Sequence, residues 1–277
     1  MLKPTASTVE PDRGLRLSSA EQTLCTELLT AEPHCLLLSG SYARGWEHSH
    51  SDVDVIVIGT PPQSADPQAE TEDEDVVRRV HYVDGRRWEI EYYSLGFTER
   101  LIELVRGAAK AADEGHDSAS WLGSYELGRA LRLLGAVALS GEEHADALRH
   151  RLRAAGVAHV VARVAVDTCD AALDDALGLL ASGDTHAAVL AASAAVGHAI
   201  DACLASHDEL WPGAKWRYRK YLSLVERRPD TALALDAEEA WRLLTLADLD
   251  PDQADDWVRR AVARCQNLLF DAMETAE

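Results

Sequence analysis

Two aspartates separated by one residue stand at the start of an apolar run in the N-terminal third of the chain. Asp52 and Asp54 lead into the run 55–58, and side chains two positions apart on a strand point to the same face. Neighbouring carboxylates repel one another unless a cation lies between them. Hard divalent ions such as Mg²⁺ take oxygen ligands and complete their shell with substrate phosphates. The pair therefore predicts a metal site that works with a nucleotide.

A Gly-Ser pair precedes this acidic pair at a characteristic distance. A first apolar run, 35–38, ends in Gly40-Ser41, and ten residues separate Ser41 from Asp52. Gly-Ser, a spacer of this length and Asp-apolar-Asp-apolar together resemble the DNA polymerase β-like nucleotidyltransferase superfamily over roughly residues 33–95. An amphipathic strand with two water-facing aspartates is the simpler alternative. The Gly-Ser pair and the apolar residues on both strand faces after Asp54 argue against it.

The resemblance carries expectations about chemistry. It implies transfer of a nucleoside monophosphate from a nucleoside triphosphate to an acceptor, with release of pyrophosphate. In that arrangement the backbone of Gly40-Ser41 holds the triphosphate, and Asp52 and Asp54 bind the metal.

The superfamily also needs a third carboxylate on a neighbouring strand. Residues 80–93 predict two strands joined by Asp84-Gly85, the strongest short hairpin signal. Glu89 and Glu91 share one face of the second strand. Similarity of 86–90 to the superfamily strand, a basic pair followed by apolar-acid-apolar, selects Glu89 to bind the metal or accept the proton of the attacking hydroxyl. Glu91 stays open as the alternative third carboxylate, as an acceptor contact or as a solvated strand end.

Three more polar residues have both a phosphate role and a structural role open. Ser51 could hydrogen-bond a triphosphate oxygen or hold its loop turn, and Arg44 could approach a phosphate or pair with a carboxylate. Lys215 lies in Pro212-x-x-Lys215-Trp216, which resembles a helix start in the C-terminal domains of antibiotic (aminoglycoside-type) nucleotidyltransferases. A lysine there reaches the triphosphate, as a compact cation should. Lys215 could equally be an exposed first-turn residue.

The elements that position these residues change in character after Ser94. Before it, residues 1–18 predict a polar arm, 19–31 a capped helix, and 59–75, with its prolines and acidic run, a solvated loop. After it, alanine and leucine recur with a period of 3.6 residues. This period predicts helices over 98–112, 121–139, 143–155, 157–182, 185–206, 214–227, 236–246 and 251–275.

We therefore predict an α+β fold in two domains. Residues 1–96 form a nucleotidyltransferase catalytic domain with a small mixed β-sheet and flanking helices. Residues 97–277 form an all-α helical C-terminal domain that binds the substrate, and the active site lies in the cleft between the two. A chain of 277 residues is long enough for this arrangement.

Charge and composition restrict the partners. The net charge is −20, and acidic residues exceed basic ones on both sides of residue 96. Long nucleic acids are bound through a basic stripe, so a templated polymerase or a tRNA-tailing enzyme is disfavoured. A small cationic acceptor suits an acidic enzyme. The acidity could equally serve solubility or a high-salt habitat.

The same composition predicts a cytoplasmic protein without a membrane segment. No uninterrupted apolar run approaches the roughly 20 residues of a membrane span, and the N-terminal residues contain no apolar signal core. Five scattered cysteines fit reduced core thiols better than disulfides or a zinc site.

Together these features predict an enzyme that uses two Mg²⁺ ions, with ATP as the default nucleotide and a small acceptor. Two alternatives stay open: an adenylyltransferase that modifies a protein partner, as antitoxin-like regulators do, and a catalytically silent nucleotide-binding module. The long helical half argues against the first. The intact Gly-Ser, Asp-x-Asp and hairpin glutamate argue against the second.

Overall fold

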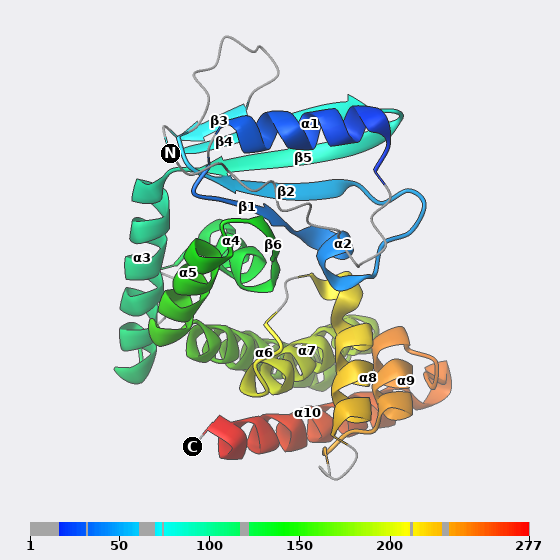
Figure 1. Cartoon of the computed structure of the whole chain (residues 1–277). Coiled ribbons are helices and arrows are strands. Elements are labelled where there is room, and N and C mark those ends of the chain that lie inside the picture. Colours follow the sequence, from blue (N-terminus) through cyan, green and yellow to red (C-terminus); the bar gives the residue numbers. More distant parts are fainter. Residues whose placement is uncertain are drawn as a thin grey trace. The chain divides into compact units, whose positions relative to one another are not determined.

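The structure is a computed structural model that describes residues 17–31, 33–60, 70–73, 75–116, 122–210, 213–228 and 233–276 (Figure 1). Most of the predicted N-terminal arm and the centre of the predicted loop over 59–75 lie outside the described residues. Contacts divide the chain into two compact units, which are described separately. Unit 1 contains Met1–Leu104 and Gly128–Ala154, and unit 2 contains Val105–Leu127 and Ala155–Glu277. Unit 1 thus includes residues that the predicted boundary at 96 assigned to the second domain.

Unit 1 contains the sheet. Among the described residues it has six strands in the order β3-β4-β5-β2-β1-β6. Strands β2 and β5 are parallel and all other neighbours are antiparallel, which confirms the predicted mixed sheet. The strands are β1 (Cys35–Leu38), β2 (Val53–Ile58), β3 (Glu70–Asp73), β4 (Val76–Val83), β5 (Arg86–Tyr93) and β6 (Val137–Ser140).

Two strands correct the prediction. Strand β3 pairs with β4 where the sequence predicts part of a solvated loop. Strand β6 occupies the end of the predicted helix over 121–139, because α4 (Ser124–Gly135) ends at Gly135 and the chain then pairs antiparallel with β1. The local apolar pattern fits a helix as well as a short strand. The unpaired edge of β1 decides between them.

The hairpin between β4 and β5 confirms its sequence signal. Asp84 and Gly85 have φ angles of 49° and 79°. A two-residue turn with positive φ at both positions matches the right-handed twist of the strands it joins. The turn fixes the register of the pair, in which Val83 lies opposite Arg86 and Arg78 lies opposite Glu91.

One face of the sheet packs against α1 (Ser19–Thr30), whose predicted capping is confirmed (Figure 1). Ser18 and Glu21 form a capping box, and Glu21 also accepts a hydrogen bond from the Trp88 indole at 3.0 Å. Alternate residues of β2 and β5 face this helix and form a core with it: Leu28, Val53, Val55, Val57, Trp88, Ile90 and Tyr92. Strand alternation therefore turns Asp54 and Glu89 to the opposite face.

Four further helices belong wholly or partly to unit 1. They are the short α2 (Gly40–Arg44), α3 (Leu95–Asp113), α4 and α5 (Glu142–Ala154). Both α3 and α4 cross the division between the two units, because the division falls at residues 104 and 127.

From Val157 onward, every regular element among the described residues of unit 2 is a helix. The predicted helices over 157–182 and 185–206 are confirmed residue by residue. The elements are α6 (Val157–Ser182), α7 (Thr185–Ser206), η2 (Ala214–Trp216), α8 (Arg217–Arg227), α9 (Ala237–Thr245), η3 (Pro251–Gln253) and α10 (Ala254–Ala276). Helices α6, α7 and α10 pack together around small side chains. The predicted α+β fold class is confirmed.

Helix α7 is the most apolar element of this unit. It is long and apolar enough to cross a membrane. Its most apolar stretch of 18 residues has a mean hydropathy of 1.6, and 61% of that stretch is buried inside the protein. Ala188, Ala192, Ala195 and Ala199 are fully buried along it. Their small side chains let α6 and α10 approach closely, so α7 has the composition of a core helix.

Candidate active site

The parallel pairing of β2 and β5 brings the three predicted carboxylates together. Asp54 lies opposite Glu89 in the register, and Asp52 immediately precedes β2. Neighbouring strands lie about 4.8 Å apart, so facing side chains can share one ligand. Oxygens of Asp52, Asp54 and Glu89 all lie within 4.8 Å of one another. This oxygen-only donor set fits a hard divalent cation.

The surroundings of Asp54 disfavour its charged form. Burial, followed by the charges of Asp52 and Glu89, raises the pKa of its carboxyl from 3.8 to about 7. The positive charge of Arg132 opposes this shift but does not cancel it. A bound cation would stabilise the charged form of Asp54, because it would offset both the desolvation and the repulsion by the neighbouring carboxylates.

Two arginines neutralise the other carboxylates. Arg87 donates from Nη1 to Asp52 Oδ2 at 2.7 Å and from Nη2 to Glu89 Oε2 at 2.8 Å. Arg78 donates from Nε to Glu89 Oε1 at 2.9 Å. Burial acts to raise the pKa of Glu89, but the hydrogen bonds and charges of Arg78 and Arg87 outweigh it and hold that pKa below its usual value.

Gly40 lies directly against the acidic cluster. Its φ angle is +65°, and a Cβ built on it would lie 1.8 Å from Asp54 Oδ2. The amide of Ser39 also donates to the Asp54 carbonyl at 2.8 Å. Only glycine fits this position, and the backbone at Gly40-Ser41 therefore approaches the carboxylates closely. The structure places Gly40 and Ser41, the first residues of α2, beside the predicted metal ligands.

Arg44 ends α2, and Ser51 lies in the loop that joins α2 to β2. The amide of His48 donates to Ser51 Oγ at 2.9 Å, and the Ser51 amide donates back to the His48 carbonyl. Ser51 therefore holds the loop turn, one of its two predicted roles, and its triphosphate contact stays a prediction. Arg44 lies over the Trp46 ring at 5.9 Å, and its phosphate role also stays a prediction.

Glu91 is held by protein groups rather than by solvent. Its side chain is 7% exposed, and Arg132 donates to both of its oxygens, with 3.2 Å between Nη2 and Oε2. The Tyr93 hydroxyl also donates to it, and Arg129 Nε lies 4.0 Å away. A solvated strand end is therefore wrong. In the register Glu91 faces Ile56, two pairs beyond Asp54 and Glu89.

The arginines of the site have weak sequence signals. Arg87 belongs to the basic pair that selected Glu89, but the pattern gave it no role. The two-residue hairpin turn could have placed Arg78 on the face of Glu89 and Glu91 by counting back along β4. Arg132 belongs to α4, and no local pattern connects it with the sheet.

Lys215 lies in unit 2, in the short helix η2 that opens α8. Its ammonium lies 5.2 Å from the centre of the Trp216 ring, and its side chain is exposed. A helix start at this position confirms the predicted element. Pro212, the first residue of the matched segment, lies outside the described residues. A contact between Lys215 and a triphosphate stays a prediction.

Comparison with known proteins supports a nucleotidyltransferase domain. Residues 24–109 match the family model of the nucleotidyltransferase domain, a segment that contains Asp52, Asp54 and Glu89. A solved structure of a nucleotidyltransferase-like protein from Exiguobacterium sibiricum is similar, with 12% sequence identity and a TM-score of 0.47, over 93% of this chain and 76% of that chain. No curated protein gives a significant match. The aminoglycoside-type subfamily stays a prediction.

Proposed function

We propose that this protein is a metal-dependent nucleotidyltransferase that transfers AMP from ATP to a hydroxyl group of a small acceptor and releases pyrophosphate. The observation that carries the proposal is the parallel register of β2 and β5, which sets Glu89 beside Asp54 and Asp52. The match of residues 24–109 to the nucleotidyltransferase domain supports the same reaction class.

The three carboxylates would hold the metal. Asp52, Asp54 and Glu89 would offer carboxylate oxygens to two Mg²⁺ ions. Bound Mg²⁺ would supply charge stabilisation to the triphosphate and acidify the attacking hydroxyl. Glu89 can accept the hydroxyl proton, since a base must lie within hydrogen-bond reach of the proton that it removes.

The remaining residues position the substrate. The backbone of Gly40-Ser41, adjacent to Asp54, would hold the outer phosphates, with Arg44, Ser51 and Lys215 as further phosphate contacts. Catalysis then depends mainly on orientation and on charge stabilisation in the transition state. A cation at Asp52 Oδ2 would share that oxygen with Arg87, whose positive charge opposes binding of the cation.

The acceptor is proposed to be small and cationic. The net charge of −20 supports this choice over an anionic acceptor, and we propose no long nucleic acid and no membrane as partner. Transfer to a hydroxyl of a protein partner would use the same carboxylates. The acceptor assay therefore has to separate the two.

The test uses two labels in parallel. The full chain is incubated with Mg²⁺, ATP and a panel of hydroxylated amines, once with label at the α-phosphate and once at the γ-phosphate. Transfer of the α-label with equimolar pyrophosphate release is expected, and Asp54→Asn should abolish it. Asp174→Asn, a change of an exposed aspartate on α6, is the matched control. Transfer of the γ-label alone would overturn the proposal, as would no α-label transfer to any amine or added protein.

A further inference from the structure

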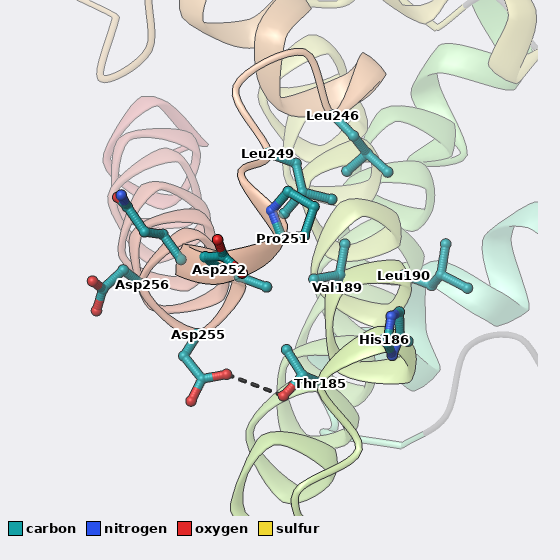
Figure 2. Close-up of a pocket in the computed structure, with 12 residues that line it drawn as sticks. Thr185, His186, Val189, Leu190, Leu246, Leu249, Pro251, Asp252, Asp255 and Asp256 are labelled. Atoms are coloured by element: carbon teal, nitrogen blue, oxygen red, sulfur yellow. Dashed lines mark hydrogen bonds between the residues drawn. The ribbon is translucent and has the colours of Figure 1, made fainter.

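A cavity lies wholly within unit 2, between the start of α7 and the chain that joins α9 to α10. It has a volume of about 550 Å³, which falls within the range of small-molecule sites. Figure 2 shows its apolar wall, to which Val189 and Leu190 of α7 contribute on one side and Leu246, Leu249 and Pro251 on the other.

Part of the apolar wall is exposed to water. Leu190 is 66% exposed, although it is a large aliphatic side chain. Leu246 adopts a φ angle of +57° at the end of α9, a conformation that is uncommon for a bulky residue. Both leucines line the cavity beside the buried core, so a ligand with an apolar body would cover surface that water now contacts.

The rim of the cavity is acidic. Asp252, Asp255 and Asp256 line it on the side of α10, and no lysine or arginine is among its described lining residues (Figure 2). Asp255 accepts a hydrogen bond from Thr185 at 3.1 Å. Within the described part of the chain, neither Asp252 nor Asp256 has a basic partner. Three carboxylates therefore line an apolar cavity, and His186 is the one group among its described lining residues that could carry a positive charge.

These aspartates also stand at the beginning of a helix. Negative side chains there interact favourably with the helix dipole, which gives them a structural role. That role requires no adjoining cavity and no exposed leucine. The combination of an apolar wall, an acidic rim and a volume of ligand size is what a capping role leaves unexplained.

We propose that this cavity binds a small organic cation with an apolar body, such as an arylalkyl amine. The apolar part would lie against Leu190, Leu246 and Leu249, and the ammonium would lie at Asp252 and Asp256. The site is independent of the carboxylates on β2 and β5, and its occupancy does not depend on nucleotidyl transfer.

The test compares two ligands of equal shape and opposite charge. Titration calorimetry on the full chain at low salt uses 4-phenylbutylamine and 4-phenylbutyrate. The amine should bind at least about ten-fold more tightly, since several exposed charge interactions of modest size act in the same direction. The preference should shrink when salt is raised, because these charges are exposed.

Location is tested by variants and by methyl spectra. Asp252→Asn/Asp256→Asn should remove most of the preference for the amine. Asp174→Asn/Asp175→Asn, which changes two exposed aspartates of α6 by the same charge, should leave it unchanged. Methyl resonances of Val189, Leu190, Leu246 and Leu249 should shift on titration, with urea unfolding confirming that the variants fold. The proposal would be overturned if the two ligands bound equally tightly or if the amine did not bind. It would also be overturned if both double variants lost the preference for the amine equally, or if the shifts were confined to other methyl groups.

Discussion

Replacing Asp54 by asparagine should stabilise the metal-free protein, and the gain should grow with pH. The folded protein holds the pKa of Asp54 at about 7, mainly by burial and then by Asp52 and Glu89, against an ordinary value of 3.8. Because the folded pKa lies above the unfolded one, the unfolded chain loses this proton first as pH rises. The wild type therefore loses stability between about pH 4 and pH 7, and Asp54→Asn does not.

The size of the effect follows from the shift. A difference of about 3 pKa units corresponds to roughly 4 kcal/mol of unfolding free energy, most of it developed by pH 8 and a smaller part by pH 5. The advantage of Asp54→Asn over the wild type should therefore increase by about 2.5 kcal/mol between pH 5 and pH 8. Contributions of the new amide that do not depend on pH cancel in this comparison.

The assay is urea unfolding of the two proteins at several pH values in the presence of a chelator. Asp174→Asn, which changes an exposed carboxylate, serves as the control and should follow the wild type at every pH. Adding Mg²⁺ at pH 8 should raise the stability of the wild type and narrow the gap. A difference between Asp54→Asn and the wild type that stays constant from pH 5 to pH 8 would refute the raised pKa of Asp54.

Four further outcomes are expected. Glu89→Gln should lower kcat by orders of magnitude with little change in nucleotide affinity; kinetics in which Glu91→Gln does this instead would move the catalytic role to Glu91. Glu91→Gln should lower the unfolding free energy by about 3 kcal/mol, because it removes the carboxylate charge that pairs with Arg132 and lies near the buried Arg129; denaturant titration with no loss would contradict this. Gly40→Ala should abolish metal binding, whereas Gly85→Ala, with a φ of +79° but open space around it, should alter stability only; similar calorimetric metal affinities in both would contradict the close contact with Asp54. Mg²⁺ and a nonhydrolysable ATP analogue together should raise the melting temperature by more than the sum of the increases that each causes alone. Nucleotide binding that does not depend on metal would exclude a site shared by metal and nucleotide.

Local sequence determined most of the helices and the hairpin. The predicted helix over 251–275 illustrates this: Asp250 accepts from the Asp252 amide at 3.0 Å, Pro251 opens η3, and the α10 residues Trp257, Val258, Ala261, Cys265 and Leu268 are buried. Capping, the fixed φ of proline and the 3.6-residue period act over a few residues, so they can be recognised without tertiary information. Asp84-Gly85 is local for the same reason.

The acidic pair was also local, but its third partner was not. The spacing of Asp52 and Asp54 needs only strand alternation. Glu89 required the superfamily pattern, because the parallel pairing of β2 with β5 joins segments more than thirty residues apart in the chain. The observed register agrees with that placement, while the catalytic role of Glu89 stays a prediction.

Tertiary structure alone decided how the charges of the site are balanced. Arg132 of α4 donates a hydrogen bond to Glu91 of β5. Residues 137–140 form β6 instead of the end of the predicted helix, because they pair with the edge of β1. Neither contact has a local pattern, since each depends on which segments the fold brings together. The pKa of Asp54 depends on the same neighbours and on burial. The sequence therefore predicted which residues could bind a metal. The packing around the sheet decided how strongly the charged form of Asp54 is disfavoured without one.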